Sequence, residues 1–257
     1  MSSTETLSIT PCADTSETYE NLAFISERTL DFLLIPSDIS IKCYDFKISE
    51  YQRSLFYELG VPLPESIDKA VVKRQAEFLA GRYSASSALK VLGINSRNIA
   101  IGKHRSPVWP DKIIASITHT TTTSLCAASY KDNYQYLGID IEYEISTELM
   151  NEIKRSIITR NEEEMLTEHT MQENSLNFSK VFTLVFSAKE SLFKALYPSV
   201  GYYFDFSAAS ITQINTANNS FTLVLAEDLS TKLTKGAEFT GFFHQIEQQI
   251  LTVIAQK

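Results

Sequence analysis

The most constraining feature of this sequence is the segment Gly-Ile-Asp-Ile-Glu at residues 138–142, which places two carboxylates two residues apart in an apolar run. In a β-strand, residues at this spacing lie on one face, so Asp140 and Glu142 point one way and the two isoleucines pack the other way. Gly138 leaves room for another backbone or a ligand to approach closely. Two acids so placed can share one divalent cation, although the same alternation is also typical of an ordinary strand with one solvated face.

A second segment supplies a third acid. Residues 186–196 predict a helix, because apolar positions recur along them and no glycine or proline interrupts them before Pro198. Glu190 lies in this helix between Lys189 and Lys194. Because Glu190 and Lys194 stand at i,i+4, a surface ion pair worth about 0.2–0.5 kcal/mol is the structural alternative to a role in catalysis.

Taken together, G-I-D-I-E and the segment F-S-A-K-E-S-L-F-K-A at residues 186–195 closely resemble the two signature segments of the 4′-phosphopantetheinyl transferases. The likeness is greatest to the enterobactin-synthetase branch of that family. Such enzymes transfer the 4′-phosphopantetheine arm of coenzyme A to a serine of an acyl, aryl or peptidyl carrier protein and release adenosine 3′,5′-bisphosphate. The resemblance therefore implies a Mg²⁺-dependent transferase with coenzyme A as its substrate.

The resemblance also implies roles for the charged residues of the two segments, which form the expected catalytic set. Asp140, Glu142 and Glu190 are expected to bind one Mg²⁺, an ion that prefers oxygen ligands. Glu190 is in addition the expected acceptor of the serine proton, with a metal-bound water or Glu162 as alternatives. Lys194 is expected to stabilise negative charge on the phosphates.

Basic residues that could hold the phosphates of the coenzyme occur elsewhere in the chain too. Residues 66–92 predict a long helix that ends at Gly93, with Arg74 and Arg82 on the same side of it. A solvated basic stripe is the alternative for these two arginines. Their spacing, R-x-x-E-F-x-x-x-R, is similar to that of the enterobactin branch, where such arginines reach the 3′-phosphate of coenzyme A.

Two further segments carry groups suited to phosphate. The glycine- and proline-containing loop at residues 101–110 presents a lysine, a histidine and an arginine in succession. Arginine can donate two hydrogen bonds to one phosphate, and lysine acts there as a point charge. The segment Ala-Ser-Ile-Thr-His at residues 115–119 resembles a family motif whose hydroxyl and imidazole contact the phosphates. The expected coenzyme-binding residues are Arg74, Arg82, Lys103, His104, Arg105, Thr118, His119, Asp140, Lys189 and Lys194.

The pattern of helices and strands predicts an α+β fold. A boundary near residue 135 is expected to divide it into a coenzyme-binding half, 1–135, and a half with the metal and catalytic residues, 136–257. The resemblance implies that two similar α+β halves form a pseudo-dimer with the active site at their junction. Residues 1–20 are expected to be only partly ordered. Other elements are expected at 49–59 and 147–158 (helices) and at 204–206, 221–225, 239–243 and 251–254 (strands).

Composition excludes several classes of function. A net charge of −8 over 257 residues argues against general nucleic-acid binding, which needs a basic surface. Three separated cysteines without a C-x-x-C motif predict neither a disulfide framework nor a zinc site and fit a cytoplasmic protein. The glycine motifs of dinucleotide and P-loop sites are absent, and no apolar run reaches the length of a membrane span.

The chain is expected to be a monomeric cytoplasmic enzyme, free or associated with a synthetase complex, that serves the non-ribosomal synthesis of an enterobactin-like siderophore. Its carrier-protein partner is expected to dock through a small, locally apolar patch, because both proteins are acidic and net charge cannot draw them together. Two alternatives stay open. One is a Mg²⁺-dependent hydrolase of nucleotide-like pyrophosphates, and the other is a non-enzymatic module that binds coenzyme A or carrier proteins.

Overall fold

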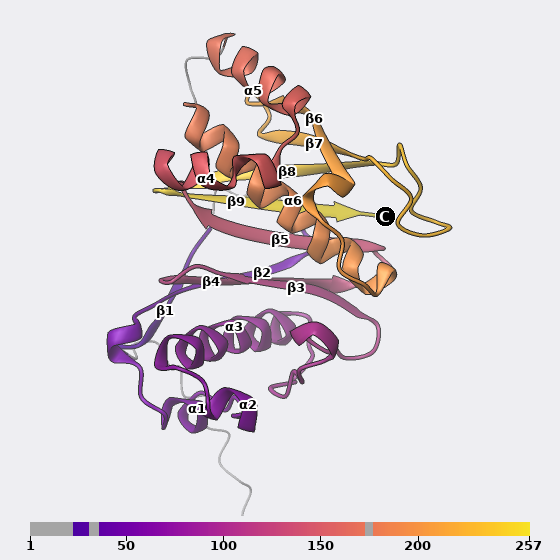
Figure 1. The fold of residues 1–257 in the computed structure, drawn as a ribbon. Helices are drawn as coiled ribbons and strands as arrows, with labels where there is room; N and C mark the ends of the chain where they lie inside the picture. Colours follow the sequence, from indigo (N-terminus) through magenta and orange to yellow (C-terminus); the bar gives the residue numbers. More distant parts are fainter. Residues whose placement is uncertain (1–22, 31–35, 173–176) are drawn as a thin grey trace, which may run out of the picture.

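The computed structural model describes residues 23–30, 36–172 and 177–257, which form two antiparallel sheets with helices on their outer sides (Figure 1). The expected α+β fold with two sheet-plus-helix halves is confirmed. Residues 1–20, expected to be partly ordered, lie outside the described residues. Within the described residues, no helix is long and apolar enough to cross a membrane. Cys43 and Cys126 are buried and free.

The first half is a four-stranded sheet with three helices. Its elements are β1 (Ile25–Arg28), β2 (Ser40–Phe46), α1 (Leu55–Glu58), α2 (Glu65–Asp68), α3 (Val72–Val91), β3 (Ile113–His119) and β4 (Thr123–Tyr130). The strand order is β1-β2-β4-β3. Helix α3 lies across the outer face of this sheet and packs on β2, β3 and β4 (Figure 1). Apolar residues such as Leu79 and Leu89 fill the space beneath it.

The second half is a five-stranded sheet, also with three helices. Its elements are β5 (Tyr136–Tyr143), α4 (Thr147–Ile157), α5 (Arg160–Gln172), α6 (Phe178–Val200), β6 (Ala209–Asn215), β7 (Ser220–Leu225), β8 (Glu238–Ile246) and β9 (Gln249–Gln256). The strand order is β5-β9-β8-β7-β6. Helix α6 packs on β5 and β9. The side chain of Asn177 caps its first turn by accepting a hydrogen bond from Lys180 N, and Gly201 ends it in a left-handed conformation.

Apolar side chains of the two sheets meet between them. Leu125 of β4 belongs to one cluster with Leu137, Ile139 and Ile141 of β5. Because side chains alternate along a strand, Gly138, Asp140 and Glu142 face the opposite way. The predicted alternation of this strand is therefore confirmed, and its polar face lies toward α6.

The close approach expected at Gly138 is made by the backbone of α6. A β-carbon added at Gly138 would lie 2.0 Å from the carbonyl oxygen of Ser191 and 2.8 Å from the amide nitrogen of Ala195. Only glycine can occupy this position without a shift of the helix. The contact brings the acid-bearing strand and the helix that carries Glu190 and Lys194 together.

A polar seam joins the two halves beside this contact. Strands β3 and β5 lie at the edges of their sheets, and they contact each other. The amide of Ile139 donates a hydrogen bond of 3.1 Å to Ser116 Oγ, and that of Ile141 donates one of 3.2 Å to Thr118 Oγ1. These hydroxyls satisfy buried amides at the free edge of β5, as a folded chain requires. Residues 131–135 connect the halves, and their separation into two folding units remains a prediction.

Three expected elements differ from the structure. The helix expected at 66–92 is divided, because the chain is extended at Val71 between α2 and α3. The helix expected at 49–59 is shorter and consists of a 3-10 turn at Ile48–Glu50 followed by α1. No strand forms at 204–206; instead Phe204 packs on Phe193 of α6 with 5.0 Å between ring centres. Burial of these rings against the helix outweighs the strand propensity of the aromatic residues.

Candidate active site

A cavity of about 400 Å³ lies between α3, β3 and the loop that precedes β3. Four of the cationic side chains expected to bind coenzyme A line it, namely Arg74, Arg82, Arg105 and His119. The rest of its wall consists of Ser66, Ile67, Ala70, Glu77, Phe78, Gly81, Ile101, Pro107 and Ile117. The two arginines of α3 therefore face one cavity, and a solvated stripe does not describe them.

The guanidinium of Arg82 is built into the wall of this cavity. It is 7% exposed, its Nε donates a hydrogen bond of 3.0 Å to the carbonyl oxygen of Ile99, and it lies 4.7 Å from the ring centre of Phe78. Burial, followed by the nearby charge of Arg74, lowers the pKa of Arg82 to about 10. The negative charge of an anion in the cavity would offset both effects, so the arrangement favours a phosphate group.

His119 stands at the end of β3, where the cavity approaches the second half of the protein. Burial is the largest cause of its lowered pKa, to which Arg74 and Lys194 also contribute, while Glu77 acts in the opposite direction. Its Nδ1 lies 3.3 Å from the carbonyl oxygen of Thr120. A bound phosphate would raise the pKa of His119. Once protonated, the imidazole can donate hydrogen bonds from both of its ring nitrogens.

Sequence reasoning missed Glu77 as part of this site. The carboxylate is 9% exposed and lines the same cavity as the two arginines of α3, with Lys73 Nζ at 3.8 Å. The E of R-x-x-E-F-x-x-x-R, three residues after Arg74, was the signal that could have indicated it. An acid here limits the net positive charge of the cavity and can accept a hydrogen bond from a bound ligand.

The three consecutive basic residues before β3 form a short 3-10 turn, Lys103–Arg105, and are exposed. Arg105 lines the cavity, whereas His104 contacts the ring of Tyr197 on α6. Lys103 contributes its carbonyl oxygen, which accepts a hydrogen bond of 2.8 Å from Ser106 Oγ. The structure thus brings one of the three side chains to the predicted coenzyme site. The binding of phosphate by Lys103 and His104 stays a prediction.

The carboxylate of Asp140 is the most buried of the three expected metal ligands, at 2% exposure. Its Oδ1 accepts hydrogen bonds from Thr118 Oγ1 at 3.0 Å and from Lys194 Nζ at 2.6 Å. No described residue donates a hydrogen bond to its buried Oδ2. A buried carboxylate oxygen without a partner is costly, which marks this atom as a place where a ligand would be stabilising.

The other two acids are electrostatically coupled to Asp140. Burial and the charges of Asp140 and Glu190 raise the pKa of Glu142 to about 8, against the lowering effect of Lys194. The pKa of Glu190 is also raised, by burial first and by Asp140, and Lys194 again opposes the shift. In the described part of the chain, no three His, Cys, Asp or Glu side chains are arranged so that they could hold a metal ion together. The charge of Asp140 thus acts on both glutamates, but the three carboxylates do not form a complete metal-binding site.

Lys189, predicted to contact the coenzyme, has a different environment. Its ammonium group is buried and contacts Glu162 Oε1 at 2.8 Å, and it donates hydrogen bonds to the carbonyl oxygens of Ile157 and Phe206. An ammonium has three hydrogens to donate, and these three acceptors engage them. The contacts favour a structural role for Lys189 over the predicted contact with coenzyme A.

Glu162, considered as an alternative proton acceptor, is similarly engaged within the protein. Its Oε2 accepts hydrogen bonds from the amide and the hydroxyl of Thr159, and Glu162 N donates to Thr159 Oγ1. Such a reciprocal pair is a capping box at the start of α5. Its Oε1 accepts the amide of Ile211 and contacts Lys189. Since the carboxylate is buried and both oxygens are occupied, Glu162 is a poor candidate for a catalytic base.

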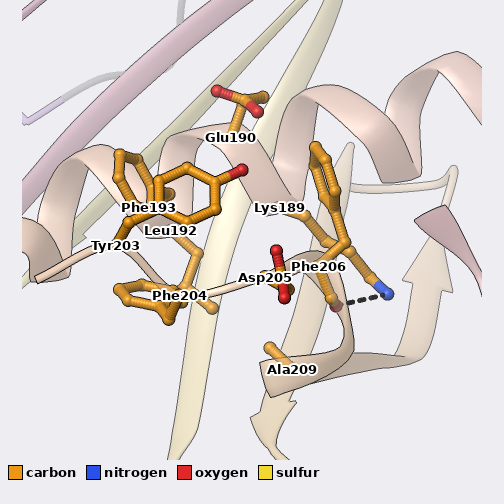
Figure 2. A pocket seen from close by; sticks show the side chains of 9 residues that line it. All are labelled: Lys189, Glu190, Leu192, Phe193, Tyr203, Phe204, Asp205, Phe206 and Ala209. Atoms are coloured by element: carbon orange, nitrogen blue, oxygen red, sulfur yellow. Dashed lines mark hydrogen bonds between the residues drawn. The ribbon is translucent and has the colours of Figure 1, made fainter. Parts of the chain in front are cut away.

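A second, smaller hollow of about 50 Å³ lies beside Glu190, lined by Lys189, Leu192, Phe193, Tyr203, Phe204, Asp205, Phe206 and Ala209 (Figure 2). The carboxylate of Glu190 points away from α6 above the rings of Phe193 and Tyr203 (Figure 2). Tyr203 is 65% exposed. Sequence reasoning assigned residues 204–206 to a strand and missed this surface. Their density, four aromatic rings within residues 202–206, was the available signal.

Comparisons with known proteins place the chain in a family. Residues 63–129 match the 4′-phosphopantetheinyl transferase N-terminal domain, and residues 136–252 match the 4′-phosphopantetheinyl transferase superfamily. Enterobactin synthase component D of Salmonella typhimurium is 36% identical over 211 residues, which are 81% of this chain and 84% of that protein. The same component of Salmonella typhi is 37% identical over 182 residues, 70% of this chain and 73% of that protein.

The similarity extends beyond these proteins. The 4′-phosphopantetheinyl transferase Svp of Streptomyces mobaraensis is 32% identical over 145 residues, which are 56% of this chain and 57% of that protein. The two family matches together cover both halves, including the cavity-lining arginines and the acids of β5 and α6. The chain therefore belongs to the 4′-phosphopantetheinyl transferase superfamily.

Proposed function

We propose that this enzyme transfers the 4′-phosphopantetheine group of coenzyme A to a serine hydroxyl of an apo carrier protein, with Mg²⁺ as its metal ion. One observation supports this most strongly. Thr118 donates a hydrogen bond to Asp140, while His119, the next residue of β3, lines the cationic cavity. A ligand that holds one phosphate among the arginines can thus extend a separate pyrophosphate toward Asp140, Glu142 and Glu190. Coenzyme A has this distribution of charge.

In the proposed complex, Arg74, Arg82, Arg105 and His119 hold the phosphates of the coenzyme. Arg82 is buried and Arg74 and His119 are half-buried, so water competes less for their contacts with phosphate than it does at the exposed Arg105. The apolar wall around Phe78 and Ile117 suits the flat face of a purine ring. Together these features explain how an enzyme with a net charge of −8 can bind a strongly anionic substrate.

The residues around Asp140 fit a hard divalent cation. The unpartnered Oδ2 atom of Asp140 and the raised pKa values of Glu142 and Glu190 are the features that an added positive charge would relieve. Oxygen ligands of this kind suit Mg²⁺. When bound, the ion neutralises charge on the pyrophosphate and helps to align it for attack. Asp140, Glu142 and Glu190 are the residues that would hold the ion.

We assign the proton transfer to Glu190. In the transfer, the serine oxygen forms a bond to the phosphorus that carries pantetheine, the bond from that phosphorus to the bisphosphate breaks, and the serine proton passes to a carboxylate oxygen of Glu190. A raised pKa makes this carboxylate a better base at neutral pH than an ordinary glutamate. Lys194, which contacts Asp140, can stabilise the charge of the departing adenosine 3′,5′-bisphosphate.

The carrier protein must place its serine beside Glu190, and the aromatic surface there is the proposed docking edge. Tyr202 and Tyr203 are 47% and 65% exposed next to the hollow that Glu190 lines. A small apolar surface of this kind can bind an acidic partner without relying on attraction between the net charges of the two proteins. The relatives named enterobactin synthase component D support an aryl or peptidyl carrier of a siderophore synthetase as the partner. The proposed setting is a monomer in the cytoplasm, free or bound to such a synthetase.

Hydrolysis of the coenzyme is the second candidate, because the same acids and cations could direct water at the pyrophosphate. The two activities can be distinguished by incubating the enzyme with coenzyme A and Mg²⁺ and measuring the released adenosine 3′,5′-bisphosphate by chromatography. The proposed transferase releases bisphosphate only when an apo carrier is added, in equal amounts to modified carrier. Rapid release without a carrier would instead favour the hydrolase. Binding without release in either mixture would favour a non-enzymatic module.

Replacement of Glu190 by glutamine tests its proposed role. The amide keeps the size of the side chain and one oxygen ligand but cannot accept a proton. We expect Glu190→Gln to bind coenzyme A as tightly as the wild type does in calorimetry and to transfer about 10²–10⁴ times more slowly. Transfer at the wild-type rate across neutral pH would exclude Glu190 as the base.

A further inference from the structure

The loop before β3 has an unusual backbone at the two residues that carry its last basic side chains. His104 and Arg105 have φ angles of 51° and 65°, in the left-handed region that residues other than glycine rarely adopt. The loop is closed at its base, where Gly102 N donates a hydrogen bond of 2.7 Å to the carbonyl oxygen of Ser106. Such conformations persist where surrounding contacts hold them, and they concentrate at functional sites.

One of these contacts crosses from the first half of the protein to the second. The imidazole of His104 meets the ring of Tyr197 edge to face, with 6.1 Å between ring centres and 81° between ring planes. Tyr197 belongs to α6, one turn from Phe193, whose ring lies 5.5 Å from it. Edge-to-face geometry of this kind is attractive beyond simple burial. The tip of the loop is thereby fastened to the helix that carries Glu190 and Lys194.

The neighbour of His104 shows what this fastening achieves. Arg105 lines the coenzyme cavity, whereas the side chain of His104 meets α6 and is not among the residues that line the cavity. The left-handed turn thus sends two consecutive side chains to different places. If the loop relaxed to an ordinary conformation, Arg105 would lose its direction toward the cavity.

We propose that His104 and Tyr197 are a positioning pair that holds Arg105 in the coenzyme cavity, and that His104 does not itself bind phosphate. The inference rests on the proposed binding of coenzyme A in this cavity and deepens it. The pair joins the coenzyme-binding half to the catalytic helix. Arg105 therefore points into the cavity only when the two halves are correctly docked. This role replaces the phosphate contact that the sequence predicts for His104.

The test measures the dissociation constant of coenzyme A by calorimetry and the kcat and KM of carrier modification. His104→Asn removes the ring but keeps a residue that tolerates a left-handed backbone, and Tyr197→Ala removes the other ring. We expect each to weaken coenzyme binding roughly two- to tenfold, as loss of an aromatic pair would. The kcat at saturating coenzyme is expected to change little. Tyr197→Phe retains the ring and is expected to bind coenzyme A as tightly as the wild type does.

The background of Arg105→Ala distinguishes positioning from direct contact. If His104 acts through Arg105, His104→Asn should have no further effect once Arg105 is alanine, and the double variant His104→Asn with Tyr197→Ala should be no weaker than either single variant. Unchanged binding in both single variants would overturn the inference. So would a full effect of His104→Asn in the Arg105→Ala background. Absence of coenzyme binding by the wild type would instead overturn the proposed function, and the positioning role with it.

Discussion

The hydroxyl of Thr118 donates a hydrogen bond of 3.0 Å to Asp140 Oδ1 and accepts one of 3.2 Å from the amide of Ile141. One side chain of the first half therefore both closes the seam between the two sheets and orients a carboxylate of the second half. The sequence predicts that this hydroxyl contacts a phosphate of the coenzyme. In the structure its hydrogen is already directed at Asp140.

This relationship predicts a selective effect of Thr118→Val, which keeps the shape of the side chain and removes the hydroxyl. The amide of Ile141 loses its acceptor, which should lower the free energy of unfolding by about 1–3 kcal/mol. Asp140 loses a donor, so the Mg²⁺ concentration needed for half-maximal activity should rise. Ser116→Ala is the matched control, since Ser116 serves Ile139 in the same seam without contacting Asp140. Equal Mg²⁺ requirements in the two variants would contradict the assigned role of Thr118.

The arginines of α3 should determine affinity for the coenzyme. Each charge-assisted contact with phosphate contributes about 1.5–3 kcal/mol, so Arg74→Ala and Arg82→Ala should each weaken binding roughly ten- to a hundredfold in calorimetry. Arg82→Ala should also reduce stability, because Arg82 packs on Phe78 and donates a hydrogen bond to Ile99. Lys90→Ala, at an exposed position in the last turn of the same helix, should bind normally. Normal binding by both arginine variants would remove the phosphate site from this cavity.

The buried ion pair of Lys189 and Glu162 should stabilise the fold and should not contribute to coenzyme binding. Lys189→Met leaves a buried carboxylate without its partner, and such a loss costs about 3–5 kcal/mol. We expect a large decrease in the urea midpoint but an unchanged KM for coenzyme A in the folded fraction. The exposed pair Lys69 and Glu65 is the control, where Lys69→Met should cost less than about 1 kcal/mol. A raised KM with unchanged stability would restore the coenzyme contact predicted for Lys189.

Stability should depend on pH through Glu142. Its pKa in the folded protein is about 8, above the ordinary value of 4.5, because of burial and the neighbouring acids. The folded state thus holds this proton more tightly than the unfolded state, so the contribution to stability is full below about pH 4.5 and is lost as the pH rises to about 8. Urea unfolding should show this decline in wild type, a smaller one in Glu142→Gln, and relief by Mg²⁺ in wild type. Identical pH profiles of the two proteins would show that the pKa of Glu142 is not raised in the folded protein.

The parts of the site that could be predicted from the sequence are those fixed by local periodicity. A strand period of two placed Asp140 and Glu142 on one face, and a helical period placed Arg74 and Arg82 on one cavity. In each case the backbone alone determines which side chains share a face.

The parts that could not be predicted depend on contacts between distant segments. Lys189 and Glu190 are adjacent in the sequence and both line the aromatic hollow, yet the ammonium of Lys189 is buried against Glu162, whereas the carboxylate of Glu190 points away from α6. The ring of α6 that His104 contacts from its left-handed turn is likewise far away in the sequence. The aromatic run at 202–206 has strand propensity, but packing against Phe193 decides its conformation.

Carrier modification is measured by the intact mass of a purified apo carrier protein after incubation with the enzyme, coenzyme A and Mg²⁺. We expect a mass increase equal to one phosphopantetheine group on the carrier serine. The increase should be absent when that serine is alanine or when Mg²⁺ is chelated, and strongly slowed with Glu190→Gln. A panel of aryl, peptidyl and acyl carriers that all keep their apo mass, while the enzyme binds coenzyme A, would exclude the proposed transfer.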